Sequence, residues 1–207
     1  MVEKLSNYRQ EDHIEEFNLS LLTEVKDLNV KGDKVFGELY KDVMVRLFQR
    51  GTLQVSYKTI KVPFMFKIKN NSLFLVVAEK KQVANSVANL FSNILFLTIG
   101  GIVNAEIPPE ALARYQRQNS SSTKVIFFDN LNLPNLEKIS LYGPSLADTN
   151  LYADYMQRGK IWYTVLTSAK NNYVVGITRD SVVTIFNKVS VEDLFAFVEE
   201  EVLQLIS

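Results

Sequence analysis

The chain of 207 residues contains no cysteine and a single histidine, His13. The lack of cysteine excludes disulfides, thiol catalysis, iron–sulfur clusters and cysteine-ligated zinc. His13 lies in a charged stretch, so we expect a solvated surface residue rather than a catalytic base. Net charge is absent too, because 23 Lys and Arg balance 23 Asp and Glu. No whole-chain field therefore points to nucleic acid or to a membrane.

Long apolar runs are also missing. The longest, residues 94–103, is about half of what a membrane span requires. Residues 1–17 are charged and have no apolar centre of the kind that a secretory signal has, so we expect a soluble, cytoplasmic protein. The motifs of phosphate loops, dinucleotide sites, serine hydrolases and histidine–glutamate metal sites do not occur. We therefore expect no cofactor, no metal and no catalytic residue of these kinds.

What the chain does contain is ample hydrophobic material and a pattern that occurs twice. The tripeptide QRG stands at 49–51 and again at 157–159, and three runs typical of strands follow each copy. In these runs aromatic and β-branched residues alternate with polar ones, as in half-buried strands. The runs are 52–59, 61–68 and 72–79 in the first half, and 160–169, 173–178 and 181–187 in the second.

Helices are expected before and after these strands. In 34–50, pairs of apolar residues recur every four positions, which indicates an amphipathic helix, and 144–159 is its counterpart. QRG would then end both helices, with Arg50 and Arg158 near the negative end of the helix dipole and a glycine as left-handed cap. A second pair of helices is expected at 83–94 and 191–206, the latter with Ser190 as its N-cap.

Each half is therefore predicted to follow the order β-β-α-β-β-β-α. The fold class is α+β, with two similar halves that each contain an antiparallel sheet of about five strands packed with helices. The predicted boundaries are a first repeat over 1–105, a linker with a short helix over 106–123 and a second repeat over 124–207. The leading strands are less defined: 124–143 suits two short strands around an Asn/Pro turn. Residues 17–32 also fit two strands, with a helix over 10–23 as the alternative.

This element order resembles that of the roadblock and longin families, in which helices sandwich a five-stranded antiparallel sheet in a profilin-like arrangement. The best local likeness is the helix–strand–strand–strand–helix run at 34–97 and 145–206. The resemblance implies a scaffold without catalysis. Such domains pair with one another, bind small GTPases or their regulators, or assemble larger complexes. Two copies in one chain can pack as a built-in pseudo-dimer, because a free sheet edge favours pairing and a tandem copy supplies the partner.

Basic residues concentrate in the first half. Between Arg46 and Lys81 there are eight Lys and Arg, and Glu79 is the only acidic residue. Lysines on a sheet can bind nucleic acid phosphates, anionic lipid or an acidic partner, or they can simply guard sheet edges. A nucleic-acid-binding protein is therefore the alternative function. The candidate binding surface consists of Lys58, Lys61, Lys67, Lys69, Lys80, Lys81, Asn85, Asn89 and Asn93.

The three asparagines of that surface recur every four residues on the helix expected at 83–94. Because asparagine is a poor helix former, an uncharged polar stripe suggests a surface that contacts a partner, or it reflects the asparagine-rich composition alone. Near the end of the chain, residues 199–201 are three consecutive glutamates, which we interpret as a solvated helix face. An enzyme that uses Asp, Lys and Tyr chemistry is the least favoured class.

Overall fold

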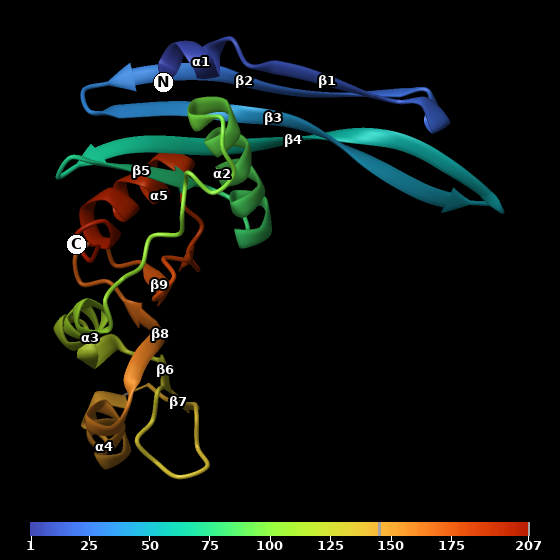
Figure 1. The fold of residues 1–207 in the computed structure, drawn as a ribbon. Helices are drawn as coiled ribbons and strands as arrows, with labels where there is room; N and C mark the ends of the chain where they lie inside the picture. The colour runs from blue at the N-terminus through green and yellow to red at the C-terminus, as the bar shows by residue number, and fades with distance from the viewer. Residues whose placement is uncertain (145, 207) are drawn as a thin grey trace. The chain divides into compact units, whose positions relative to one another are not determined.

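A computed structural model describes residues 1–144 and 146–206, so Ser145 of the predicted helix 144–159 lies outside the described residues. The chain divides into two compact units, Met1–Val103 and Asn104–Ser207. Over the described residues each unit contains one five-stranded antiparallel sheet with helices (Figure 1). The predicted α+β class, with two sheet-and-helix halves, is confirmed.

The first unit is a meander in which every strand pairs with the next one along the chain, in the order β1-β2-β3-β4-β5. Two helices accompany the sheet, and a 3₁₀ turn at Glu15–Phe17 joins its first two strands. The elements are α1 (Val2–Ser6), β1 (Arg9–Ile14), β2 (Leu19–Lys31), β3 (Lys34–Gln49), β4 (Thr52–Lys69), β5 (Ser72–Val77) and α2 (Lys81–Phe96). The helix considered for 10–23 does not form, and 17–32 contains one strand rather than two.

The helix predicted over 34–50 is wrong, because this segment is strand β3. Its apolar residues recur every four positions, and four is also a multiple of the strand period of two. The same residues therefore form two strand faces, with Val35, Leu39 and Val43 on one and Phe36, Tyr40 and Met44 on the other. The partner strand decides between the two readings, since β4 pairs with β3 along its whole length, from Lys34↔Lys67 to Gln49↔Thr52.

The runs predicted as separate strands at 52–59 and 61–68 are likewise one continuous strand, β4. In the first QRG, Gln49 ends β3, and Arg50 and Gly51 form the two-residue turn to β4, with φ of 50° and 79°. Two successive positive φ values are typical of the tightest hairpin turns. The order β-β-α-β-β-β-α is thus absent from the first unit, and the two QRG copies have different structures.

The core of the first unit lies between the sheet and α2. Phe64 and Phe66 of β4 are fully buried against Phe91 of α2, and the Phe64 and Phe91 rings meet edge to face at 4.8 Å between centroids. Gly37 of β3 makes room for this cluster, because a Cβ at this position would lie 2.6 Å from Cζ of Phe64 and 2.7 Å from Cδ2 of Leu28. Gly37 would destabilise the helix predicted for this segment, but in strand β3 it leaves the space that Phe64 and Leu28 occupy.

The second unit has the predicted element order. Its elements are α3 (Pro109–Gln118), β6 (Val125–Asp129), β7 (Ile139–Tyr142), α4 (Asn150–Arg158), β8 (Lys160–Thr167), β9 (Val174–Thr178), β10 (Val183–Ile185) and α5 (Val191–Phe197), which a π-helical turn continues over Val198–Val202. The sheet order is β10-β9-β8-β6-β7. Residues 106–123, predicted as a linker, lie in this unit, and their helix α3 packs against β8.

Helix ends in the second unit follow local chemistry. Ser190 caps α5 as predicted and forms a capping box with Asp193. Helix α4 begins after Thr149, which accepts a hydrogen bond from the Tyr152 backbone, and not at Pro144. Arg158 ends this helix as predicted. Gly159 is extended rather than left-handed, and a Cβ here would lie 2.7 Å from Cδ2 of Leu131 and 3.1 Å from the Asp129 carbonyl oxygen.

The interpretation of residues 199–201 as a solvated face is wrong for Glu201. Its carboxylate is buried and accepts hydrogen bonds from the Tyr115 hydroxyl at 2.5 Å and the Ser168 hydroxyl at 2.6 Å. The Asn171 amide donates a third, at 2.5 Å. Burial, followed by the hydrogen bond to Glu201, raises the pKa of Tyr115. This carboxylate therefore ties the C-terminal helix to α3 and to the β8–β9 loop.

We expect Gly37→Ala to destabilise the protein by about 1–3 kcal/mol, because the added methyl overpacks the fully buried ring of Phe64. Urea unfolding of the wild type, of G37A, of F64L and of the pair G37A/F64L measures the cost of the methyl group with and without the Phe64 ring. Leucine lacks the Cζ atom that the methyl meets, so the cost of G37A should shrink in the Phe64→Leu background. An equal cost in both backgrounds would show that Phe64 is not the obstacle.

Candidate functional site

The most unusual feature of the first unit is the outer half of its long hairpin. Pairing of β2 with β3 ends at Thr23↔Lys41, and pairing of β5 with β4 ends at Phe64↔Val77. In the described part of the chain, residues 43–58 therefore pair only with each other, and we call this segment the basic arm (Figure 1). Seven residue pairs, from Val43↔Lys58 to Gln49↔Thr52, give it a length of about 20 Å.

Sequence features explain where the arm begins on both sides. On the β5 side stands Pro63, which has no N–H to donate to a further ladder bond. On the β2 side the side chain of Asp42 takes the place of a backbone partner. Its Oδ2 accepts the Leu22 backbone N–H at 2.9 Å, and its Oδ1 accepts the Thr59 hydroxyl at 2.6 Å. Asp42 thus holds β2 and β4 at the point where β2 leaves the ladder.

Beyond Asp42, β1 and β2 continue as a second hairpin, residues 11–22, which we call the acidic arm. Its pairs run from Glu11↔Leu22 to Ile14↔Leu19. Both arms leave the same end of the sheet, so the first unit ends in a fork (Figure 1). The two arms touch near the guanidinium of Arg46, which lies 5.5 Å from the ring centre of Phe17.

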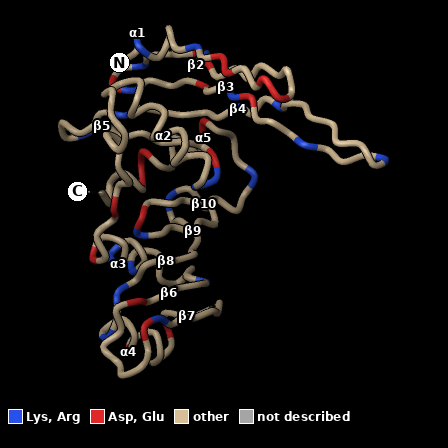
Figure 2. The backbone as a smooth tube through the Cα atoms, turned by 45° about the vertical axis from the view of Figure 1, so that its right-hand side comes forward, with Lys and Arg blue, Asp and Glu red and all other residues tan. Residues whose placement is uncertain are grey.

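The two arms carry opposite charge (Figure 2). The basic arm contains three cations and no carboxylate, and the acidic arm contains four carboxylates and no Lys or Arg. All seven charged residues are exposed, namely Arg46, Arg50, Lys58, Glu11, Asp12, Glu15 and Glu16. Among the described residues no ion pair joins the cations of one arm to the carboxylates of the other. The charges of both arms therefore face solvent.

Apolar side chains accompany the cations on the basic arm. Phe48 and Leu53 stand directly opposite each other near its tip and are 75% and 51% exposed, and Tyr57 is half exposed beside Met44. An isolated two-stranded ribbon is marginally stable in water. A long exposed strand edge with apolar side chains is also a favoured site of association. The arm therefore has the composition of a contact surface.

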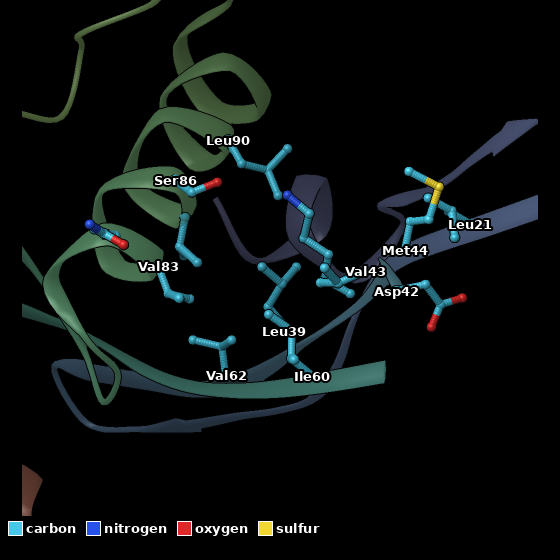
Figure 3. Close-up of a pocket in the computed structure, with 13 residues that line it drawn as sticks. Leu21, Leu39, Asp42, Val43, Met44, Ile60, Val62, Val83, Ser86 and Leu90 are labelled. Atoms are coloured by element: carbon cyan, nitrogen blue, oxygen red, sulfur yellow. The ribbon is translucent and has the colours of Figure 1, made fainter. Parts of the chain in front are cut away.

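A cavity of about 400 Å³ lies at the base of the fork, between α2 and the strands (Figure 3). Its lining is mostly aliphatic, with Lys41, Gln82 and Ser86 as polar additions. Asp42 also borders it, but both of its oxygens already accept hydrogen bonds. The full lining is Leu21, Leu39, Lys41, Asp42, Val43, Met44, Ile60, Val62, Gln82, Val83, Ser86, Val87 and Leu90.

The predicted lysine surface is not one strip. Lys58 lies on the basic arm, but Lys61 and Lys67 form ion pairs at 2.7 Å with Glu38 and Asp33. The hydrogen bond from Lys61 lowers the pKa of Glu38, and that from Lys67 lowers the pKa of Asp33.

The remaining predicted residues lie elsewhere in the first unit. Lys69 ends β4, opposite Ser72 in register, whereas Lys80 is the N-cap of α2 and Lys81 its first residue. The asparagines Asn85, Asn89 and Asn93 are exposed on α2, on the side away from its buried Val87 and Phe91. His13 is exposed on the acidic arm, as expected, with Nδ1 3.2 Å from the Ser20 hydroxyl.

Comparison with known proteins supplies no further assignment, since no family model matches the chain and no curated protein matches it in sequence. Among the described residues no helix has the length and apolar character that crossing a membrane requires.

The residues that sequence reasoning missed are the apolar ones on the basic arm, Phe48, Leu53 and Tyr57, and the carboxylates of the acidic arm. The signal that could have found them is charge segregation. Residues 11–22 lack Lys and Arg, and residues 43–58 lack Asp and Glu. The helix assigned to 34–50 hid the second segment, because it placed Phe48 on a buried stripe.

Replacing Asp42 by alanine should loosen the fork. The Leu22 amide loses its acceptor, so its hydrogen exchange is expected to accelerate by about 10- to 100-fold, which corresponds to the loss of a hydrogen bond to a charged group. Amide exchange followed by NMR measures this. Thr59→Val is the matched control, because it removes the other bond to Asp42 and leaves the Leu22 amide protected. Unchanged exchange of Leu22 in D42A would contradict the role given to this carboxylate.

Proposed function

We propose that this protein is an interaction or scaffold protein whose contact element is the basic arm of the first unit. The observation that carries the proposal is the exposure of Phe48, Leu53 and Tyr57 on a ribbon that has no neighbouring strand among the described residues. Large exposed aromatic and aliphatic side chains, together with arginine, are the residues that dominate binding energy in protein interfaces.

The element order of the second unit supports the same class of function. The order β6-β7-α4-β8-β9-β10-α5 is the one on which the resemblance to roadblock and longin domains rests. We extend the proposal to such a domain in Asn104–Ser207, with a small GTPase or a larger assembly as its partner. The first unit has a different order, so the tandem form of the resemblance is not proposed.

The ion pairs of Lys61 and Lys67 weigh against the nucleic-acid alternative. A lysine that is already paired with a carboxylate has little charge left to offer a phosphate. The cations that remain on the basic arm have four carboxylates on the neighbouring hairpin. A polyanion that approaches the fork meets both signs, which removes the electrostatic gain on which nonspecific nucleic acid binding depends.

We expect the pair F48S/L53S to lose most of the proteins that the tagged full-length chain retains from a native extract, identified by mass spectrometry. Both side chains are already exposed, so thermal stability should change little. Val30→Ser is the matched control, because Val30 is 56% exposed in β2 near the opposite end of the sheet. Retention of the same proteins by F48S/L53S would contradict the proposal. Nuclease-sensitive material that salt removes would favour nucleic acid instead.

A further inference from the structure

Resting on the proposed function, we infer that the partner of the basic arm is a second copy of this chain. The two copies would be related by a two-fold axis that lays the basic arm of each along the acidic arm of the other. The observation behind this inference is that both halves of a complementary surface, one cationic and one anionic, occur side by side in one protomer. A partner whose charge is of one sign only would require one charged arm, not two arms of opposite charge.

Symmetry makes the arrangement self-consistent. In a two-fold dimer the same surface is used twice, so residue i of one copy contacts j of the other and j contacts i. The sheet order β1-β2-β3-β4 places the acidic arm beside the basic arm at one end of the sheet. Rotation by 180° within the plane of the fork turns a second fork to face the first and exchanges the positions of its arms. Each arm then meets one of opposite charge.

Charge complementarity also selects among the possible occupants. The carboxylates of Glu11, Asp12, Glu15 and Glu16 repel a nucleic acid or an anionic membrane that the three cations would attract. A purely acidic protein meets the same repulsion. A second fork satisfies both arms at once. Complementary potentials of this kind steer association and suppress wrong partners.

The apolar side chains have a place in the same arrangement. The basic arm is about 20 Å long, and the four residue pairs of the acidic arm, from Glu11↔Leu22 to Ile14↔Leu19, span about 10 Å before its turn. A basic arm laid antiparallel along a partner's acidic arm therefore brings Phe48 and Leu53 to the base of the partner's fork. The cavity lined by Leu21, Val43 and Met44 opens there. An apolar tip and an apolar cavity thus occur at matching ends of the two surfaces.

The test is a charge exchange on the purified full-length chain, followed by sedimentation velocity and light scattering. In R50E/K58E both arms are acidic, and in E11K/E15K/E16K, where Asp12 is the one carboxylate left on the arm 11–22, both arms are basic. Arg46 stays in place because of its contact with Phe17. The wild type should be a dimer whose dissociation constant rises with salt. Each reversed variant alone should dimerise about 10- to 100-fold more weakly, and an equimolar mixture of the two should form a heterodimer.

Recovery in the mixture distinguishes lost charge complementarity from lost folding, since a misfolded variant would not be rescued. The combined variant R50E/K58E/E11K/E15K/E16K is the second check and should dimerise alone. Three outcomes overturn the inference: a wild type that stays monomeric at about 500 µM, a concentration at which even weak complexes form, a dimer indifferent to both reversals, or a mixture without heterodimer. If the wild type is monomeric while F48S/L53S still abolishes capture of other proteins, the inference that the partner is a second copy is wrong. The proposed function then stands.

Discussion

The architecture of the first unit depends on the carboxylate of Asp42. Where β2 leaves β3, the backbone N–H of Leu22 would lose its ladder partner, and an orphaned amide is costly unless another acceptor is present. Asp42 supplies that acceptor and simultaneously holds the Thr59 hydroxyl of β4. One side chain therefore replaces a ladder bond and keeps three strands in register at the point of divergence. Two hairpins can project from one sheet because this junction is satisfied.

The fork also separates charge in a chain whose net charge is zero. Opposite charges that stand on adjacent hairpins usually neutralise each other within the molecule. Here the arms diverge, and the contact between them is that of Arg46 with an aromatic ring rather than with a carboxylate. Both sets of charge consequently remain available for a partner. The local segregation of charge, which a net charge of zero conceals, is the electrostatic property on which the proposed interaction depends.

Sequence reasoning found the second unit better than the first, and the reason is physical. Its helix α4 is followed by a glycine that marks its end in the sequence. Helix α5 begins with Ser190 and Asp193, whose spacing is that of a capping box. The segment 34–49 offers no such evidence, because a repeat of four residues satisfies both helix and strand. The hairpin becomes evident only when segment 52–69 is considered together with segment 34–49. The two segments are similar in length and both are rich in β-branched and aromatic residues. The hydrophobic pattern of a single segment does not show which other segment pairs with it.

The candidate site could be predicted only in part for the same reason. Lys58 was found because it is basic, but whether a lysine is free depends on the residue across the sheet. Glu38 and Asp33 neutralise Lys61 and Lys67 through register and turn geometry that a linear reading does not contain. Exposure is a property of the same kind. Phe48 looks like a core residue in the sequence, and it is exposed because neighbouring strands end before reaching it.

The meander of the first unit also has a consequence for how the chain acquires its structure. Every strand of this sheet pairs with its successor, so its contacts are close in sequence and the loops that must close are short. Folding rates rise as contacts become more local. The second sheet instead places β8 against β6, which requires the chain to pass β7 and α4 first. The N-terminal half is therefore expected to fold early, and during synthesis its fork is complete while the second half is still being made.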